Sequence, residues 1–162
     1  MLDITLDNLL QFVQDKGYKA HIQEKTDQVV IELEIEGKTF PIFLKLFEPS
    51  GLLQMLLFFP ANIKDGAEND LARLLHLANK ELDLPGFGME ENKRLFFYRQ
   101  MLPVRDNKIE EYLLEKYLKA FEAVLQAYGP VVITVAVGKN TFEDVMKKAQ
   151  KRQDNQGKGS NG

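Results

Sequence analysis

The chain has no cysteine among its 162 residues and only two histidines, His21 and His76. The lack of cysteine excludes disulfides, thiolate metal sites and thiol catalysis, and it fits a reducing compartment. No apolar run approaches the roughly 20 residues that a bilayer-spanning helix needs. The first residues are acidic and lead into an amphipathic segment, which is unlike a secretory signal peptide. We therefore expect a cytoplasmic protein without membrane insertion.

An excess of positive charge is also lacking. The formal net charge is -3 and the sequence pI is about 5.5. A nucleic-acid-binding surface needs clustered Lys and Arg, so we expect no nucleic-acid partner. The composition, with 44% hydrophobic and 28% charged residues, is that of an ordinary globular chain. It predicts a single domain over residues 1–152, followed by a disordered polar tail over 153–162.

Side chains that carry out catalysis are few. Serine occurs only at Ser50, in a turn, and at Ser160, in the predicted tail. Neither histidine has a second histidine or a carboxylate at metal-ligand spacing, and the carboxylates lie where solvated faces require them. The sequence thus predicts no catalytic residue, no metal site and no cofactor. The interpretation is a protein that is not an enzyme, with a small-ligand domain or enzyme as a less favoured alternative.

Two strand-like segments are apolar on both faces, and they are the most informative part of the chain. They are residues 52–59, LLQMLLFF, and residues 95–102, LFFYRQML. Strands of antiparallel sheets usually keep one face for the core and one for water. A chain of this length offers few helices to cover both faces. The spare apolar face therefore predicts a binding surface.

Hydrophobic periodicity predicts the order of the other elements. We expect a helix over 4–16, three strands between 18 and 47, a helix from Asp65 to Leu82 with Asp65 and Glu68 as a capping box, and a helix over 109–128 that Gly129-Pro130 ends. Residues 85–88 are predicted as a loop. Residues 131–137 suit a strand or an extended segment, and Thr141 with Asp144 suits the start of a short helix to about Arg152. This order predicts an α+β fold, with an antiparallel sheet of about five strands packed against two or three helices.

The middle and C-terminal half resemble a known superfamily. The segment Leu71–Asn79, the segment Leu84–Val104 with its strand ending in Leu-Pro-Val, and the long helix that follows are similar to the type III secretion chaperone and YbjN-like superfamily. The likeness extends over residues 3–128. The resemblance implies a non-catalytic homodimer that holds an extended segment of a client protein, as the secretion chaperones do. The alternative that it implies is a sensory or stress-related regulator of the YbjN kind, without an exported client.

This reading assigns two surfaces. We expect the helix pair 66–83 and 109–128 to cover one face of the sheet, and the other face to serve self-association or a client, provided that residues 131–152 do not cover it. The predicted dimer interface consists of Leu53, Met55, Leu95, Phe97 and Met101. The predicted client-binding residues are Leu10, Val30, Phe43 and Phe47.

Overall fold

The structure, a computed structural model, describes residues 1–159 and has a six-stranded antiparallel sheet at its centre. The strands lie in the order β2-β3-β4-β5-β7-β6. Their bounds are β2 (Lys19–Gln23), β3 (Gln28–Ile35), β4 (Lys38–Phe47), β5 (Leu52–Phe58), β6 (Phe87–Glu90) and β7 (Leu95–Pro103). The predicted α+β fold with an antiparallel sheet is confirmed, with six strands in place of about five.

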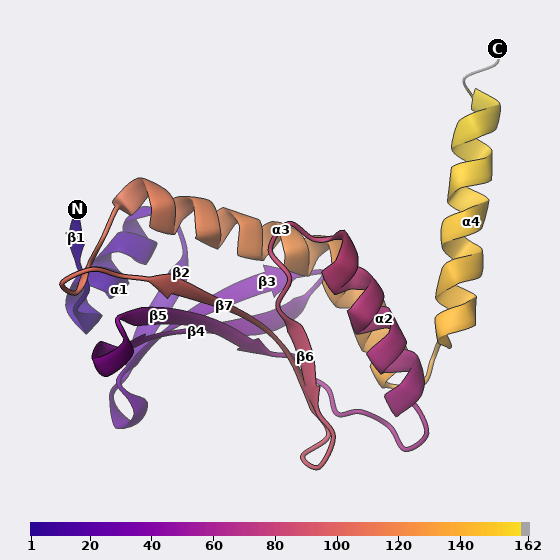
Figure 1. Ribbon diagram of the computed structural model, residues 1–162, viewed down its shortest axis with the longest axis horizontal. Helices are drawn as coiled ribbons and strands as arrows, with labels where there is room; N and C mark the ends of the chain where they lie inside the picture. The colour runs from indigo at the N-terminus through magenta and orange to yellow at the C-terminus, as the bar shows by residue number, and fades with distance from the viewer. Residues whose placement is uncertain (160–162) are drawn as a thin grey trace.

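Three helices cover one face of this sheet (Figure 1). Helix α1 (Leu6–Asp15) packs on β2 and β3, and α2 (Glu68–Glu81) packs on β6. Helix α3 (Glu111–Ala136) extends over the sheet and then packs beside α2. The remaining elements are the paired short strands β1 (Leu2–Asp3) and β8 (Lys108–Ile109), the single turns η1 (Glu24–Thr26) and η2 (Glu48–Ser50), and α4 (Phe142–Gly159), which stands away from the body.

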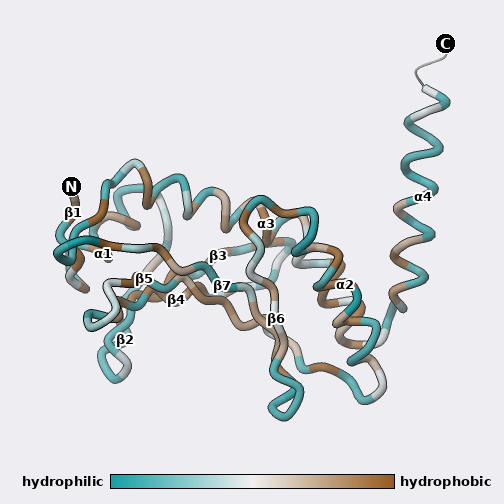
Figure 2. Tube along the Cα trace, in the orientation of Figure 1, coloured by the Kyte–Doolittle hydropathy of each residue, from teal (hydrophilic) through white to brown (hydrophobic). Residues whose placement is uncertain are grey.

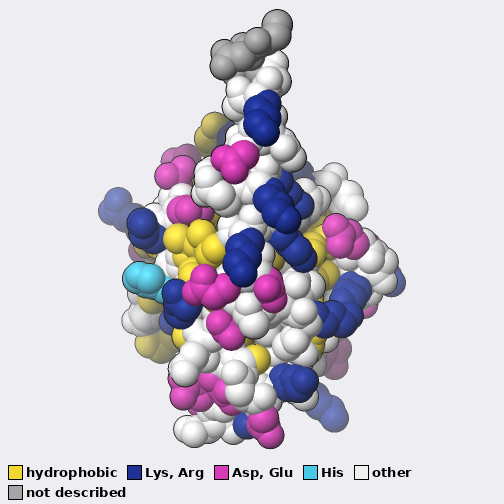
Figure 3. All heavy atoms as spheres, turned by 90° about the vertical axis from the view of Figure 1, so that its right-hand side faces the viewer, with side chains coloured by type: hydrophobic (Ala, Val, Ile, Leu, Met, Phe, Trp, Pro, Cys, Tyr) yellow, Lys and Arg dark blue, Asp and Glu magenta, His cyan; other side chains and the backbone are white. Residues whose placement is uncertain are grey.

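Side chains along the strands alternate between the two faces of the sheet, as the period of two requires. Those that point toward the helices are almost completely buried, and they include Ile31, Ile42, Leu44, Leu53, Met55, Leu57, Phe96, Tyr98 and Leu102. Figure 2 shows the same concentration of hydrophobic residues in the sheet, while the outer part of α4 is mostly hydrophilic. Figure 3 shows lysine, arginine and acidic side chains on this projecting part. The core therefore lies between the sheet and α1, α2 and α3.

Aromatic rings pack along the strands and between β7 and α3. Phe59, just after β5, stacks on Phe96 of β7 with ring centroids 4.8 Å apart. The ring of Tyr98 lies 4.7 Å from that of Phe121 in α3. Such pairs contribute about 0.5–1.5 kcal/mol beyond the area that they bury. This packing sets the position of α3 over β5 and β7.

Helix α3 continues beyond the point at which it is predicted to end. Pro130 lies inside the helix, and residues 131–136, expected as a strand or an extended segment, are helical. Proline removes one backbone hydrogen bond and favours a kink, and the helix bends in Figure 1. Burial outweighs this cost, because Val132, Val135 and Ala136 are completely buried. The added segment lies on the helix-covered side, so it leaves the opposite face of the sheet open.

Two further local predictions are wrong. Residues 87–90, within and just after the predicted loop, pair with β7 as strand β6. The N-cap of α2 is Ala67, with no side-chain cap bond, so Asp65 and Glu68 do not form a capping box. Both carboxylates instead form ion pairs with Arg94, in the turn between β6 and β7. The role of these two acidic residues is therefore a tertiary contact with Arg94 and not the capping of α2.

Helix α4 begins where it is predicted to begin. The amide N–H of Asp144 donates to Thr141 Oγ1 at 3.1 Å, and the Thr141 amide donates to Asp144 Oδ2 at 2.9 Å. These bonds to Thr141 hold the pKa of Asp144 below its usual value. The helix extends to Gly159 and so includes residues 153–159, which belong to the predicted tail. The last three residues of the predicted tail lie outside the described residues.

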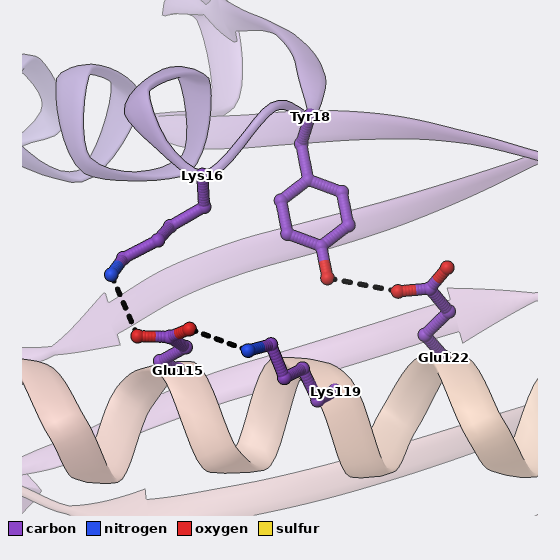
Figure 4. Close-up of polar contacts among 5 residues, drawn as sticks. All are labelled: Lys16, Tyr18, Glu115, Lys119 and Glu122. Carbon is purple, nitrogen blue, oxygen red and sulfur yellow. Dashed lines mark hydrogen bonds and ion pairs between the residues drawn. The ribbon is translucent and has the colours of Figure 1, made fainter.

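Polar side chains in the segment between α1 and β2 bind side chains of α3 (Figure 4). Lys16 Nζ lies 2.6 Å from Glu115 Oε2, and Lys119 Nζ lies 2.6 Å from Glu115 Oε1. The Tyr18 hydroxyl donates to Glu122 at 2.9 Å, and burial together with this carboxylate raises the pKa of Tyr18. The N-terminal helix is thereby connected to the core helix through charged and polar groups as well as apolar ones.

Replacing Glu115 by glutamine is expected to flatten the acid dependence of stability. Lys119 and then Lys16 lower the pKa of Glu115 to about 2 in the folded protein. A carboxylate with a lowered folded pKa stabilises fully above its unfolded pKa of about 4.3, and this contribution is lost as the pH falls toward the folded value. The wild type should therefore lose more stability between about pH 4.5 and pH 2 than Glu115→Gln does.

Urea unfolding at several pH values measures this difference. Glu91→Gln is the matched control, because Glu91 lies in an exposed turn and its side chain has no ion pair among residues 1–159. If the free energy of unfolding changes equally with pH in the wild type and in Glu115→Gln, the ion pairs of Glu115 contribute nothing to the acid dependence of stability.

Candidate functional site

The candidate site is the face of the sheet that the helices leave uncovered, which we call the outer face. Its central row runs across the strands as His21, Val30, Phe43, Leu56 and Arg99, each paired with the next. The outer face also carries the polar residues Lys45 and Gln54. Its further apolar residues are Pro41, Phe47, Leu52, Phe58, Leu95, Phe97 and Met101. Among residues 1–159, no helix lies against it (Figure 1).

The outer face has large apolar side chains that are only partly covered. Phe58, at the end of β5, is 38% exposed, and Met101 on β7 is 36% exposed. Phe58 and Phe97 face each other on paired strands with ring centroids 6.1 Å apart. Beside them is a shallow hollow of about 200 Å³, lined by Leu56, Phe58, Glu90, Lys93, Leu95, Phe97 and Arg99. A contiguous apolar surface of this kind on a folded chain indicates an interaction site.

Charges of opposite sign flank the apolar centre. On the β2–β3 side, Glu32 accepts from Lys19 at 2.6 Å, and each group moves the pKa of the other toward the charged form. On the β7 side, Arg99 is exposed and lies over the ring of Phe97. It has no ion-pair partner among the described residues. The outer face thus has an apolar row through Val30, Phe43 and Leu56, with the polar pair Lys45 and Gln54 next to it along β4 and β5. The Glu32–Lys19 ion pair lies on one flank and the unpaired Arg99 on the other.

The structure brings together residues that the sequence assigns to two separate surfaces. Val30 and Phe43, predicted to bind a client, lie on the outer face with Leu95, Phe97 and Met101, which are predicted to form the dimer interface. Val30 is only 5% exposed there, because its neighbours cover it. Leu56 and Phe58 are not among the residues predicted for either surface. Their signal is their position in β5, where every second residue from Leu52 to Phe58 belongs to the outer face.

Leu53 and Met55 do not fit the predicted dimer interface. Both point toward the helices and have no exposed surface. Because they pack in the core of this chain, a second chain has no access to them. The apolar pattern of β5 predicts two faces, but it does not tell which of them the helices cover.

The remaining predicted client-binding residues lie at the edge of the fold. Leu10, on α1, is half-buried against the core. Phe47, at the end of β4, is 37% exposed and lines a second groove of about 590 Å³ between α1 and the β4–η2 segment. The apolar lining of this α1–β4 groove consists of Ile4, Leu6, Leu9, Leu46, Phe47 and Pro49.

One buried polar cluster holds the start of β6 in place. Asn79 Oδ1 accepts from the amides of Gly86 and Phe87 at 3.0 and 2.9 Å, and its Nδ2 donates to Phe87 O. The Tyr98 hydroxyl and Gln100 Nε2 both donate to Leu84 O. Burial raises the pKa of Tyr98 to about 12. No buried side-chain nitrogen or oxygen in residues 1–159 lacks a hydrogen-bond partner, so the role of this cluster is to position the chain.

The few serine and histidine side chains lie at exposed positions in the described part of the chain. No group of three His, Asp or Glu side chains in residues 1–159 is placed to hold a metal ion. Ser50 donates to Phe47 O in a turn, and Ser160 lies outside the described residues. His21 and His76 are both exposed, and the nearest carboxylate to His21 is Glu32 at 3.9 Å.

Helix α3 is long enough and apolar enough to cross a membrane, by length and hydropathy alone. In this fold its apolar residues form the core, with Leu114, Leu118, Phe121 and Leu125 nearly or completely buried under the sheet. The core position explains the apolar composition.

Comparisons with known proteins agree with this fold. Residues 5–134 match the YbjN family, described as "Putative bacterial sensory transduction regulator". The crystal structure of E. coli YbjN, described as "a putative transcription regulator", superposes with a TM-score of 0.58 at 13% sequence identity, over 80% of this chain and 95% of that one. A search of curated proteins gave no match. The family match spans most of the chain, including the sheet and α1 to α3, and the chain therefore belongs to the YbjN family.

Proposed function

We propose that this protein is a non-catalytic regulator that acts by binding protein chains, and that it forms a homodimer through the outer face. The observation that carries the proposal is the uncovered apolar outer face, formed by β3, β4, β5 and β7. The description of the family as a sensory regulator supports a regulatory role. The lack of cysteine in the chain favours action in the cytoplasm.

The strand order suits a two-fold arrangement of two outer faces. An axis that runs along the strands between β4 and β5 pairs β4 with β5, β3 with β7 and β2 with β6 of the second copy. Sheets that pack face to face lie about 10 Å apart with their strands roughly aligned. Phe43, Leu56 and Phe58 then form the centre of the interface in both copies. A two-fold interface needs such a self-complementary surface.

Charge complementarity supports the same arrangement. The β3 strand of one copy carries Glu32 and lies over β7 of the other, which carries Arg99. Glu32 lies in the row of Pro41, Phe58 and Phe97, and Arg99 lies in the next outward-facing row. The carboxylate of one copy then lies diagonally across from the guanidinium of the other, twice in the dimer. Such pairs fix the register of an interface more than they raise its affinity.

Charge reversal tests this arrangement. Glu32→Arg and Arg99→Glu should each weaken the homodimer, because each substitution brings like charges diagonally across from one another. An equimolar mixture of the two variants should form a heterodimer, since both contacts are then restored. Light scattering at tens of micromolar and native mass spectrometry measure the species.

A monomeric wild type would refute the homodimer. A mixture that stays monomeric while the wild type dimerises would refute this pairing of strands. Thermal unfolding of each variant checks that its fold is intact.

A secretion-chaperone role is the second candidate, and the α1–β4 groove favours it. The groove is open, mostly apolar and large enough for several side chains of an extended segment. Purification of the tagged protein from its native cells separates the two roles. An exported protein bound through its N-terminal segment supports the chaperone, whereas regulatory proteins alone support the regulator.

A further inference from the structure

We propose that a hollow beside the end of α3 binds a small amphipathic anion, a molecule with an apolar body and one carboxylate or sulfonate group. The hollow has a volume of about 390 Å³. It lies between the β3–β4 hairpin, the chain just after β5 and the last part of α3. We call it the α3-end hollow, and its lining residues include Ile35, Phe40, Ala61, Pro130, Ile133 and Val137.

The floor of the α3-end hollow is apolar and firmly held. Phe40 is 1% exposed and Ile133 is 6% exposed, so both belong to the packed core. The ring of Phe40 lies 6.1 Å from that of Phe59 in an edge-to-face arrangement. The volume is at the small end of the range for ligand sites, and such sites usually combine apolar walls with a few polar groups. The shape thus suits a small apolar body.

Two lysines on the rim give the α3-end hollow its charge. Lys38 comes from the first residue of β4, and Lys139 comes from the segment after α3. Neither ammonium group has an ion pair or a hydrogen bond among the described residues. Glu36 is the one acidic residue in the lining, so the rim carries a net positive charge. Charge-assisted hydrogen bonds from lysine favour a carboxylate or sulfonate over a neutral group.

Local backbone geometry holds these groups in position. Glu36 and Gly37 both have positive φ, 50° and 75°, as a two-residue hairpin turn requires. This turn places Lys38 at the mouth of the α3-end hollow. On the other side, the amides of Lys139 and Asn140 both donate to Thr134 O, which turns the chain back at the end of α3. Both lysines therefore extend from backbone that is itself fixed.

A pair of fluorescent probes tests the proposal on the full-length protein. The anionic probe is 1-anilinonaphthalene-8-sulfonate, and N-phenyl-1-naphthylamine has the same ring system without the sulfonate. We expect saturable binding of both by the wild type. The double variant Lys38→Gln, Lys139→Gln should bind the anionic probe about tenfold more weakly and the neutral probe with unchanged affinity.

Two further variants locate the binding. Ala61→Trp should fill the α3-end hollow and abolish binding of both probes, whereas Tyr112→Asp, at an exposed position in the first turn of α3, should leave it intact. Thermal unfolding of each variant shows whether the fold is preserved, since the anionic probe also binds partly unfolded proteins. The proposal is overturned if the folded wild type binds neither probe, if the double variant binds the anionic probe normally, or if Ala61→Trp leaves the binding of both probes unchanged.

Discussion

Replacing Gly86 by alanine is expected to lower the free energy of unfolding by about 3 kcal/mol or more. A Cβ at this position would lie 2.2 Å from the backbone oxygen of Arg99 and 2.8 Å from Gln100 Nε2. Its neighbours cannot yield easily. The Gly86 amide donates to Asn79, and its oxygen accepts from the Arg99 amide at 3.0 Å. The added methyl group must therefore separate the start of β6 from β7.

Urea unfolding measures this loss, and Gly129→Ala is the matched control. Gly129 is buried, but the nearest atom to its added Cβ is a Phe40 ring carbon at an ordinary 3.7 Å. Alanine is also the better helix former, by about 1 kcal/mol. Gly129→Ala should thus be neutral or slightly stabilising. A Gly86→Ala protein with wild-type stability would mean that β6 can move away from β7 at little cost.

The substitution Phe58→Asp is expected to abolish self-association and partner binding while the fold stays intact. Phe58 is partly exposed and lies near the centre of the outer face, so an aspartate there leaves the core unchanged. In the two-fold arrangement its ring is buried by the second copy. Loss of a central aromatic group at an interface typically costs 2 kcal/mol or more, and a buried carboxylate without a partner adds to this. The dissociation constant should rise by at least about 100-fold.

Sedimentation equilibrium measures the dissociation constant, and Tyr112→Asp is the matched control. Tyr112 is 69% exposed in the first turn of α3, away from the outer face, and an acidic residue is favourable near a helix N-terminus. This control should associate as the wild type does. If Phe58→Asp associates normally, or if Tyr112→Asp dissociates equally, the outer face is not the interface. Capture of partners from native cells gives the second readout.

Local signals in the sequence were sufficient for most of the secondary structure. Alternation over residues 18–47, helical spacing in 109–128 and the Thr141–Asp144 cap each depend on near neighbours, and the structure has these elements. Where distant contacts compete with local signals, the prediction is wrong. Gly129-Pro130 is a strong stop signal, yet burial of Val132 and Val135 continues the helix. Asp65 resembles a cap, yet it pairs with Arg94.

The candidate ligand site had no signal in the sequence. Lys38 and Lys139 are about a hundred residues apart, and each alone resembles an ordinary surface lysine. Only the packing of α3 against the β3–β4 hairpin brings them to one rim. The polar cluster of Asn79, Tyr98 and Gln100 was missed for the same reason, since its partners are backbone groups of residues 84–87.

The sequence by itself determined that residues 52–59 and 95–102 are strands with two apolar faces, because alternation with a period of two is a local property of the chain. It also indicated that one of these faces lacks a cover. Only the tertiary structure decided which face this is. The helices pack over Leu53, Met55, Phe96 and Tyr98, and Leu56, Phe58, Leu95 and Phe97 remain on the outer face. The choice depends on where α1, α2 and α3 come to lie, and contacts between distant segments set those positions.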